Sequence, residues 1–354
     1  MISKEHQLLF DLLKGIPPKN LDGVDADALY LLFQRHRLFP IASVIMGLLD
    51  EQGITKWKKA VHSKTMKSLH HTVILGQIMD AYQKVGIQVY PLKGPVLAQT
   101  IYKSIGERHF RDLDIMKRGG DIHQVIDIAG DLGYELKSPK MGLTQKQWRY
   151  YLKHKKHIEL FKKDIGVLVE IHTSIENHGL LTAPDVDEFL RNPLIEKVGN
   201  ASYPCLNRES TFLYLVIHGG LHQYRRLFWL RDVAEALKRW KLDHQRILTM
   251  AESIGIERLL GASLLLSQEY FDTDIPREYR KYLEENNNII NRLKRSSMYM
   301  IEGPEFPTFR GRLRLHFFTL RIKSGLYHKC KVIVETMHRV YIGKRYEMKS
   351  SITK

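Results

Sequence analysis

The chain has 354 residues, of which 44% are hydrophobic and 27% are charged, a composition that excludes a disordered protein. This length exceeds one ordinary core, so we expect two or three packed units. The 55 Lys and Arg outnumber the 39 Asp and Glu, and the net charge of +16 favours a polyanionic partner: nucleic acid, an anionic membrane surface or a phosphorylated small molecule.

The cysteines and the apolar segments indicate the cellular setting. Cys205 and Cys330 are the only cysteines, and their spacing is not that of metal ligands or of a disulfide framework. The N-terminal residues lack the apolar segment of a signal peptide, and no stretch of about 18 apolar residues occurs. We therefore expect a cytoplasmic protein without a transmembrane segment.

The first predicted elements are helices, from residue 1 to about residue 87. Near the end of this stretch, apolar residues spaced i, i+3, i+4 and i+7 form one helical face: Leu75, Ile78, Met79 and Tyr82. Gly86 is expected to end this helix.

Between residues 87 and 175 the apolar period changes repeatedly, which predicts alternating strands and helices. The predicted elements are a strand over 87–92, a helix after Gly94, a strand through Leu113, a helix from about Asp121, and strands near Ile158 and Val169. The last two strands are joined by a tight turn. Leu168, Glu170 and His172 lie on the face opposite Val167, Val169 and Ile171.

After about Glu176 the pattern again predicts helices, with N-caps expected at Ser210 and Asp243. The predicted fold class is α+β, with a small mixed-sheet core between N-terminal and C-terminal helical segments. The predicted divisions of the chain are 1–64, 65–176 and 177–354.

The middle segment contains the pattern Asp-x-Asp on a strand. Side chains alternate along a strand, so Asp112 and Asp114 point the same way while Leu113 and Ile115 point into the core. Two adjacent carboxylates repel each other unless a cation lies between them, and Mg²⁺ prefers such hard oxygen ligands. The alternative is a solvated edge strand or turn, where this short pattern is common.

Three neighbouring features favour a metal and nucleotide site. Glu170 supplies a third carboxylate from another strand, although an exposed Glu on a half-solvated sheet is the alternative. At Lys93 and Gly94 a strand turns into a helix, whose N-terminal N–H groups can bind phosphate. Arg108 and Arg111 flank the aspartates and could pair with them, neutralise a triphosphate or be solvated.

These residues resemble a known family. The order of strand, Lys-Gly turn, helix, Arg-x-x-x-Asp-x-Asp strand, helix and Glu-bearing strand resembles the DNA polymerase β-like nucleotidyltransferase superfamily. The segments LKGPVLAQTIY, ERHFRDLDIM, LGYEL, VEIHTSIE and IHGGLHQYRRLFWLRDVAEAL are similar to a bacterial nucleotidyltransferase family that has Leu-Lys-Gly in place of Gly-Ser. The resemblance covers residues 82–237.

The resemblance implies a reaction and its residues. Asp112, Asp114 and Glu170 would be the catalytic residues and would hold two Mg²⁺ ions. The turn of Lys93 and Gly94 would hold the phosphates of the nucleotide. Apart from the resemblance, Arg108, Arg111 and His172 are also expected to bind the nucleotide. The implied activity is transfer of a nucleoside monophosphate from a nucleoside triphosphate (NTP) to an acceptor, with release of pyrophosphate. Pro95 stands where the superfamily has serine, so phosphate contacts there would come from Lys93 and backbone N–H groups.

Several alternatives remain open for the function. The acceptor is an unidentified small molecule, sugar, peptide or protein. The main alternative to an active enzyme is a catalytically inactive nucleotide- or RNA-binding regulator or scaffold. A less favoured hypothesis is an enzyme that adds nucleotides to RNA 3′ ends, for which no RNA-binding module is recognisable.

Two further segments are weaker candidates for binding sites. His218 and His222 are four residues apart on a predicted helix, but the Glu of a zinc-protease motif is missing and Gly219 and Gly220 weaken the helix. The basic and aromatic segment 309–346 suits RNA, a membrane surface or an acidic peptide, but amphipathic helices with solvated Lys and Arg ends are the favoured interpretation.

Overall fold

The computed structural model describes residues 2–140, 142–176, 186–303, 317–323 and 325–347. The chain folds into two compact units, each assembled from three separate stretches. The first unit comprises residues 1–66, 101–109 and 208–324, and the second comprises residues 67–100, 110–207 and 325–354. The division into consecutive segments 1–64, 65–176 and 177–354 stays a prediction.

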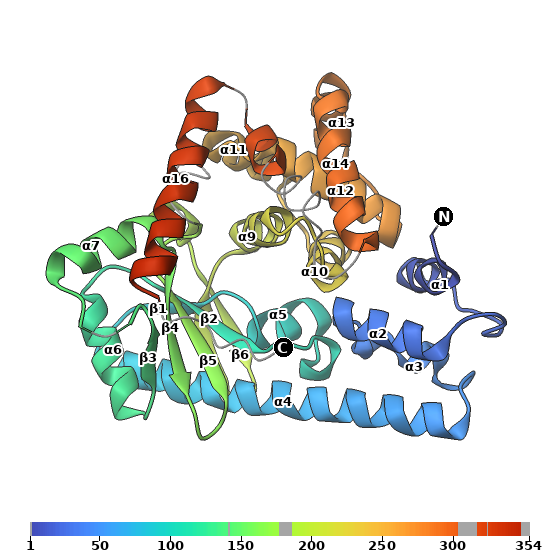
Figure 1. Cartoon of the computed structure of the whole chain (residues 1–354), viewed down its shortest axis with the longest axis horizontal. Coiled ribbons are helices and arrows are strands. Elements are labelled where there is room, and N and C mark those ends of the chain that lie inside the picture. Colours follow the sequence, from blue (N-terminus) through green and yellow to red (C-terminus); the bar gives the residue numbers. More distant parts are fainter. Residues whose placement is uncertain (1, 141, 177–185, 304–316, 324, 348–354) are drawn as a thin grey trace. The chain divides into compact units, whose positions relative to one another are not determined.

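The second unit contains a five-stranded sheet in the order β1-β2-β5-β4-β3 (Figure 1). Its strands are β1 (Val89–Pro91), β2 (Asp112–Lys117), β3 (Glu135–Ser138), β4 (His157–Lys162) and β5 (Val167–His172). Only the central pair β2 and β5 is parallel, and the pairs β1–β2, β5–β4 and β4–β3 are antiparallel. The predicted α+β class with a mixed sheet is therefore confirmed.

This unit also contains several helices. They are the second half of α4 (Glu51–Lys84), most of α5 (Pro95–Tyr102), α6 (Ile122–Asp131), α7 (Gln145–His154), α8 (Val186–Phe189) and α16 (Leu326–Arg345). The predicted apolar face of α4 is buried at Leu75, Ile78, Met79 and Tyr82. Asp121 caps α6 by accepting a hydrogen bond from the His123 N–H, as its position before an apolar helix predicts.

Some elements differ from the prediction. A hairpin of β6 (Leu194–Val198) and β7 (Ala201–Cys205) lies where helices were expected. Gly199 adopts a positive φ of 63° at its turn, which favours a tight reversal over a continuing helix. The strand β3 and the helix α7 were not predicted, because β3 is short and mostly exposed and α7 is strongly polar. A capping box at Thr144 and Gln147 was the missed signal for α7.

The first unit is helical. Its elements are α1 (Lys4–Leu13), α2 (Ala26–His36), η1 (Phe39–Ile41), α3 (Ser43–Met46), the first half of α4, η2 (Ile105–Glu107), α9 (Arg208–Leu221), α10 (Leu227–Arg239), α11 (His244–Ile254), α12 (Glu257–Phe271), α13 (Arg277–Glu285) and α14 (Asn287–Glu302). Asp243 caps α11 as predicted, by accepting from the Arg246 N–H. Ser210 is not an N-cap, because α9 already begins at Arg208 and Ser210 is buried inside it.

The glycine pair in α9 has a packing function. A Cβ atom on Gly220 would lie 2.7 Å from Cδ1 of Leu259 in α12. Glycine therefore allows the two helices to approach closely, which compensates for its low helix propensity.

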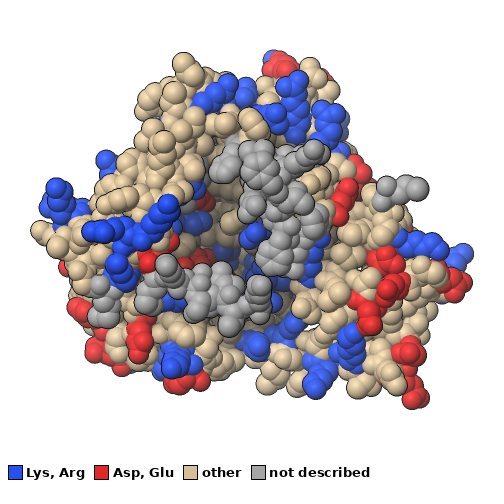
Figure 2. Space-filling view, viewed as in Figure 1, with Lys and Arg blue, Asp and Glu red and all other residues tan. Residues whose placement is uncertain are grey.

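The segment 309–346 is helical over α16, while its residues 309–316 and 324 lie outside the described part of the chain. Helix α16 exposes large apolar side chains such as Leu326, Tyr327 and Met337, so the amphipathic interpretation stays a prediction. On the face shown in Figure 2, Lys and Arg occupy several separate areas with Asp and Glu between them. No helix among the described residues combines the length and the apolar content needed to cross a bilayer.

Candidate active site

Three carboxylates lie on one face of the central strand pair. Asp112 and Asp114 alternate with buried Leu113 along β2, and Asp114 stands directly opposite Glu170 of the parallel strand β5. Residues opposite each other on neighbouring strands point to the same face of a sheet. Asp114 is buried, whereas Asp112 and Glu170 are half-buried. The predicted grouping of these three residues on adjacent strands is therefore found.

Lys93 neutralises the buried aspartate. Its Nζ lies 2.8 Å from Oδ1 of Asp114, and only 8% and 1% of the two side chains are exposed. Burial by itself lowers the pKa of the Lys93 ammonium, but the attraction of Asp114, Asp112 and Glu170 outweighs burial and raises it. Lys93 is thus an internal cation paired with Asp114.

The turn before α5 lies against β2. The Leu92 N–H donates to the Asp114 carbonyl over 2.9 Å, which extends the β1–β2 pairing to the turn. Gly94 has a φ of +66°, a conformation that disfavours any residue with a Cβ. Pro95 begins α5, where its missing N–H costs no hydrogen bond. The Lys-Gly-Pro turn is therefore shaped by backbone geometry beside the carboxylates.

Two histidines complete the cluster. Nε2 of His172 donates to Oδ1 of Asp114 over 3.2 Å and lies 3.5 Å from Oε2 of Glu170. His157 of β4 faces His172 in the antiparallel pair, with ring centroids 5.1 Å apart, and its Nδ1 lies 3.6 Å from the same Glu170 oxygen. Sequence reasoning missed His157. Extending the hairpin register outward from the 163–166 turn would have paired it with His172.

The charge states in this cluster follow from burial and partners. Burial lowers the pKa of His172, but hydrogen bonds to Asp114 and Glu170 outweigh burial and raise it. Burial raises the pKa of Glu170, but the hydrogen bond from His172 and the attraction of His157 and His172 together outweigh burial and lower it. Burial lowers the pKa of His157 to about 3. Glu170 is therefore an anion and His157 a neutral imidazole near pH 7.

The two predicted arginines differ in burial. Arg108 is buried in the first unit, where its Nη2 and Nε donate to Asp232 over 2.8 and 3.0 Å. The Tyr102 hydroxyl donates to the same carboxylate over 2.9 Å. Arg111 is exposed immediately before Asp112, and its carbonyl lies 3.3 Å from Nε2 of His71. Asp232 is thus a buried ionic residue of the first unit.

The histidines of α9 pack against an aromatic ring. The His222 ring stacks on Trp229 with centroids 5.0 Å apart, and the His218 ring meets Trp229 edge-on at 5.5 Å. This arrangement is typical of an aromatic core cluster.

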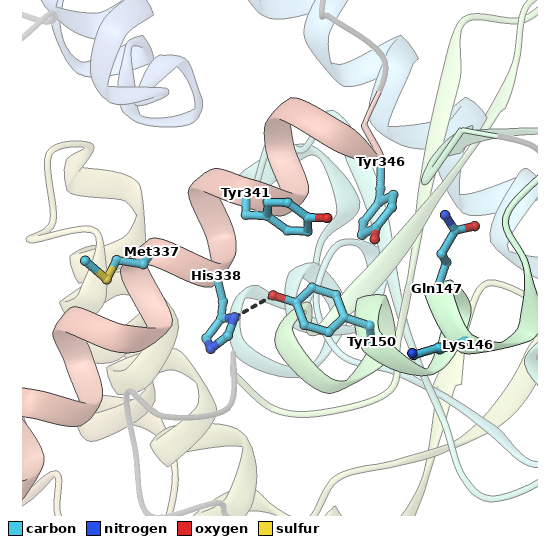
Figure 3. Close-up of a pocket in the computed structure, with 7 residues that line it drawn as sticks. All are labelled: Lys146, Gln147, Tyr150, Met337, His338, Tyr341 and Tyr346. Atoms are coloured by element: carbon cyan, nitrogen blue, oxygen red, sulfur yellow. Dashed lines mark hydrogen bonds between the residues drawn. The ribbon is translucent and has the colours of Figure 1, made fainter.

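A separate cavity of about 490 Å³ is bounded by α7 and α16 in the second unit (Figure 3). The described residues that line it are Lys146, Gln147, Tyr150, Met337, His338, Tyr341 and Tyr346. Tyr150 and Nδ1 of His338 form a hydrogen bond of 2.5 Å across it. None of the clustered carboxylates is among these lining residues.

Comparison with protein families identifies the reaction class. Residues 22–272, well over half of the chain, match the model of a family described as "uncharacterised nucleotidyltransferase". The chain belongs to this family. Nucleotidyl transfer is therefore the class of reaction, and a nucleotide is the substrate. The matched region contains Lys93, Asp112, Asp114 and Glu170. A search of curated proteins and a search of solved structures each gave no match.

Proposed function

We propose that this chain is an Mg²⁺-dependent nucleotidyltransferase of the DNA polymerase β-like superfamily. It would transfer a nucleoside monophosphate from an NTP to an acceptor and release pyrophosphate. The observation that carries the proposal is the convergence of Asp112, Asp114 and Glu170 on one face of two parallel strands, beside the Lys93-Gly94 turn. Family membership supports the reaction class.

The donor atoms in the cluster fit magnesium. Mg²⁺ is bound through one or two carboxylates together with substrate phosphates, and Asp112, Asp114 and Glu170 offer such oxygens from neighbouring strands. Bound Mg²⁺ ions would stabilise the attacking and the departing oxygens of an in-line displacement at the α-phosphorus. Two ions and three carboxylates are the expected set.

Lys93 and His172 would orient the Asp114 carboxylate and offset its negative charge. Lys93 and His172 both contact Oδ1 of Asp114, so they fix the rotamer of that carboxylate and limit its repulsion from Glu170. The N–H groups at the start of α5 are suited to bind phosphate oxygens. Because its pKa is lowered, Glu170 is a good anionic ligand and a weak base. We therefore assign Glu170 to metal binding.

The acceptor belongs to an open set of small molecules, sugars, peptides and proteins. Nucleic acid is not the favoured acceptor, because the sequence contains no recognisable RNA-binding module. Arg108, Arg111 and His172 stay predicted nucleotide-binding residues.

A binding experiment tests the proposal without knowledge of the acceptor. Calorimetry and thermal unfolding are measured with ATP, GTP, CTP and UTP, each with and without Mg²⁺. At 100 times its dissociation constant, a ligand stabilises the folded state by about 2.7 kcal/mol. We expect one or more triphosphates to stabilise the wild type in an Mg²⁺-dependent way.

The variants connect this binding to the carboxylates. Asp112→Asn/Asp114→Asn and the milder Asp112→Asn should lose the Mg²⁺-dependent stabilisation. The matched control Asp127→Asn/Asp131→Asn removes two exposed carboxylates from α6 and should bind like the wild type. Equal binding by Asp112→Asn and the wild type, or no binding of any triphosphate, contradicts the proposal.

An inactive nucleotide-binding regulator is the second candidate. The observation in its favour is the Lys93 ammonium, which already balances the charge of Asp114. Nucleotide binding that is equally tight with and without Mg²⁺ would support this alternative.

A further inference from the structure

Three potential metal ligands form a compact group on the same sheet face. Glu170 and His172 are two residues apart on β5, so their side chains point the same way, and His157 stands opposite His172 on β4. One ligand atom from each of the three lies within 4.8 Å of the other two. Two positions on one strand and a facing position on its neighbour thus supply three ligands from rigid backbone.

The distances fit a small tetrahedral ion. Oε2 of Glu170 lies 3.5 Å from Nε2 of His172 and 3.6 Å from Nδ1 of His157. Ligands about 2.1 Å from a tetrahedral ion are separated by about 3.4 Å. Octahedral ligands at the same bond length are separated by about 3.0 Å. These two separations are therefore closer to tetrahedral spacing, and the ligand atoms of His157 and His172 lie within 4.8 Å of each other.

The environment of His157 points to a ligand that the protein itself does not provide. Nδ1 of His157 is buried and has no hydrogen-bond partner among the described residues. A buried polar atom of this kind is costly unless something satisfies it. This nitrogen faces the carboxylate of Glu170, so a cation between the two would satisfy both groups.

The donor types select the class of ion. Imidazole nitrogen suits zinc, copper, iron and nickel, whereas Mg²⁺ prefers oxygen ligands. We propose that His157, Glu170 and His172 bind a divalent transition-metal ion, with Zn²⁺ the best fit. A water molecule would complete the tetrahedral set, because Oδ1 of Asp114 is already paired with Nζ of Lys93 over 2.8 Å. This site goes beyond the proposed function: it shares Glu170 with the proposed magnesium site, but its two histidines need neither nucleotide nor Mg²⁺.

Co²⁺ is the probe that tests this site, because its visible absorption is strong in tetrahedral and weak in octahedral coordination. The full chain is titrated with Co²⁺ in the absence of nucleotide and Mg²⁺, and then with Zn²⁺ as a competitor. A Cys330→Ser background removes the exposed thiol, which could bind either ion. We expect one Co²⁺ per chain with intense bands, displaced by an equivalent of Zn²⁺.

Variants show which residues hold the ion. His157→Gln and His172→Gln should each weaken binding by at least about 100-fold, since loss of a direct ligand exceeds the 10–100-fold effect of an outer partner. His70→Gln removes an exposed histidine on α4 and should bind like the parent. Unchanged affinity in a folded His157→Gln variant, or only weak octahedral bands in the parent, overturns the proposal.

A second measurement needs no variant. X-ray absorption of the Zn²⁺-loaded parent should count two imidazole ligands, and a count of zero or one overturns the proposal even if both histidine variants fail to fold. Asp112→Asn separates this site from the proposed function, because it should lose Mg²⁺-dependent NTP binding and keep Co²⁺. Failure of either proposal is therefore visible on its own.

Discussion

Nζ of Lys93 lies 2.8 Å from Oδ1 of Asp114, and both side chains are almost fully buried. This ion pair joins the turn before α5 to the middle of β2. Removing one partner of a buried pair is strongly destabilising because it leaves an uncompensated charge in the interior.

We expect Lys93→Met to lower the free energy of unfolding by about 3 kcal/mol, the low end for a broken buried pair, because His172 still contacts Asp114. Urea unfolding measures this loss. Lys137→Met, which removes a partner of Glu159 that is 45% exposed, should change stability by less than about 0.5 kcal/mol. Adding Asp114→Asn to Lys93→Met should recover part of the loss. A Lys93→Met protein as stable as the wild type would show that the pair does not stabilise the fold.

Arg108→Lys should lower the free energy of unfolding by about 3 kcal/mol, although lysine carries the same charge as arginine. Arg108 donates from two nitrogens to the buried Asp232, and a lysine cannot reproduce this two-point contact. Arg118→Lys is the matched control, since its pair with Asp187 is exposed. Chemical denaturation of the two variants gives the comparison, and equal losses would argue against a special role of the buried pair.

Gly94→Ala should destabilise the fold by about 1–2 kcal/mol, because alanine disfavours the positive φ of 66°. The added Cβ would meet its neighbours no closer than 3.7 Å, so backbone strain is the only expected cause. Gly130→Ala in α6 has open space and should stabilise by up to about 1 kcal/mol. Thermal unfolding distinguishes the two signs. A stabilised Gly94→Ala protein would contradict the need for glycine at the turn.

His109 should make the protein acid-sensitive. Burial, followed by the charges of Lys64 and Arg231, lowers the pKa of His109 to about 4. An unfolded histidine binds its proton near pH 6.5, so the unfolded state binds more protons between pH 6.5 and 4, and the folded state loses stability as the pH falls through this window.

Relative to His109→Gln, the wild type should lose up to about 3 kcal/mol more stability between pH 7 and pH 4. The measurement is urea unfolding at several pH values, and the slopes are compared, so that any constant cost of the substitution cancels. His62→Gln, at an exposed position on α4, should keep the wild-type slope. Parallel slopes for His109→Gln and the wild type would exclude His109 as the source.

Local patterns predicted the central strands and the facing of their carboxylates. The apolar and polar side chains alternate around Asp112 and Asp114, and a tight turn precedes Val167. Both signals involve only a few residues, whose side-chain directions are fixed by strand and turn geometry. Two elements were predicted wrongly or missed because their local signals are weak. The β6–β7 hairpin and the polar helix α7 lack a strong apolar period, and the signals that mark them, a glycine turn and a capping box, are short.

The sequence by itself determined the central strands, their carboxylates and the Lys-Gly turn, because each depends on side-chain alternation or backbone preferences within a short segment. Only the tertiary structure decided that Lys93 is an internal cation, that Arg108 pairs with Asp232, 124 residues away, and that His157 joins Glu170. Burial of a charge or an imidazole costs free energy unless a neighbouring group compensates it. The packing of segments that are distant in the sequence decides which group is that neighbour.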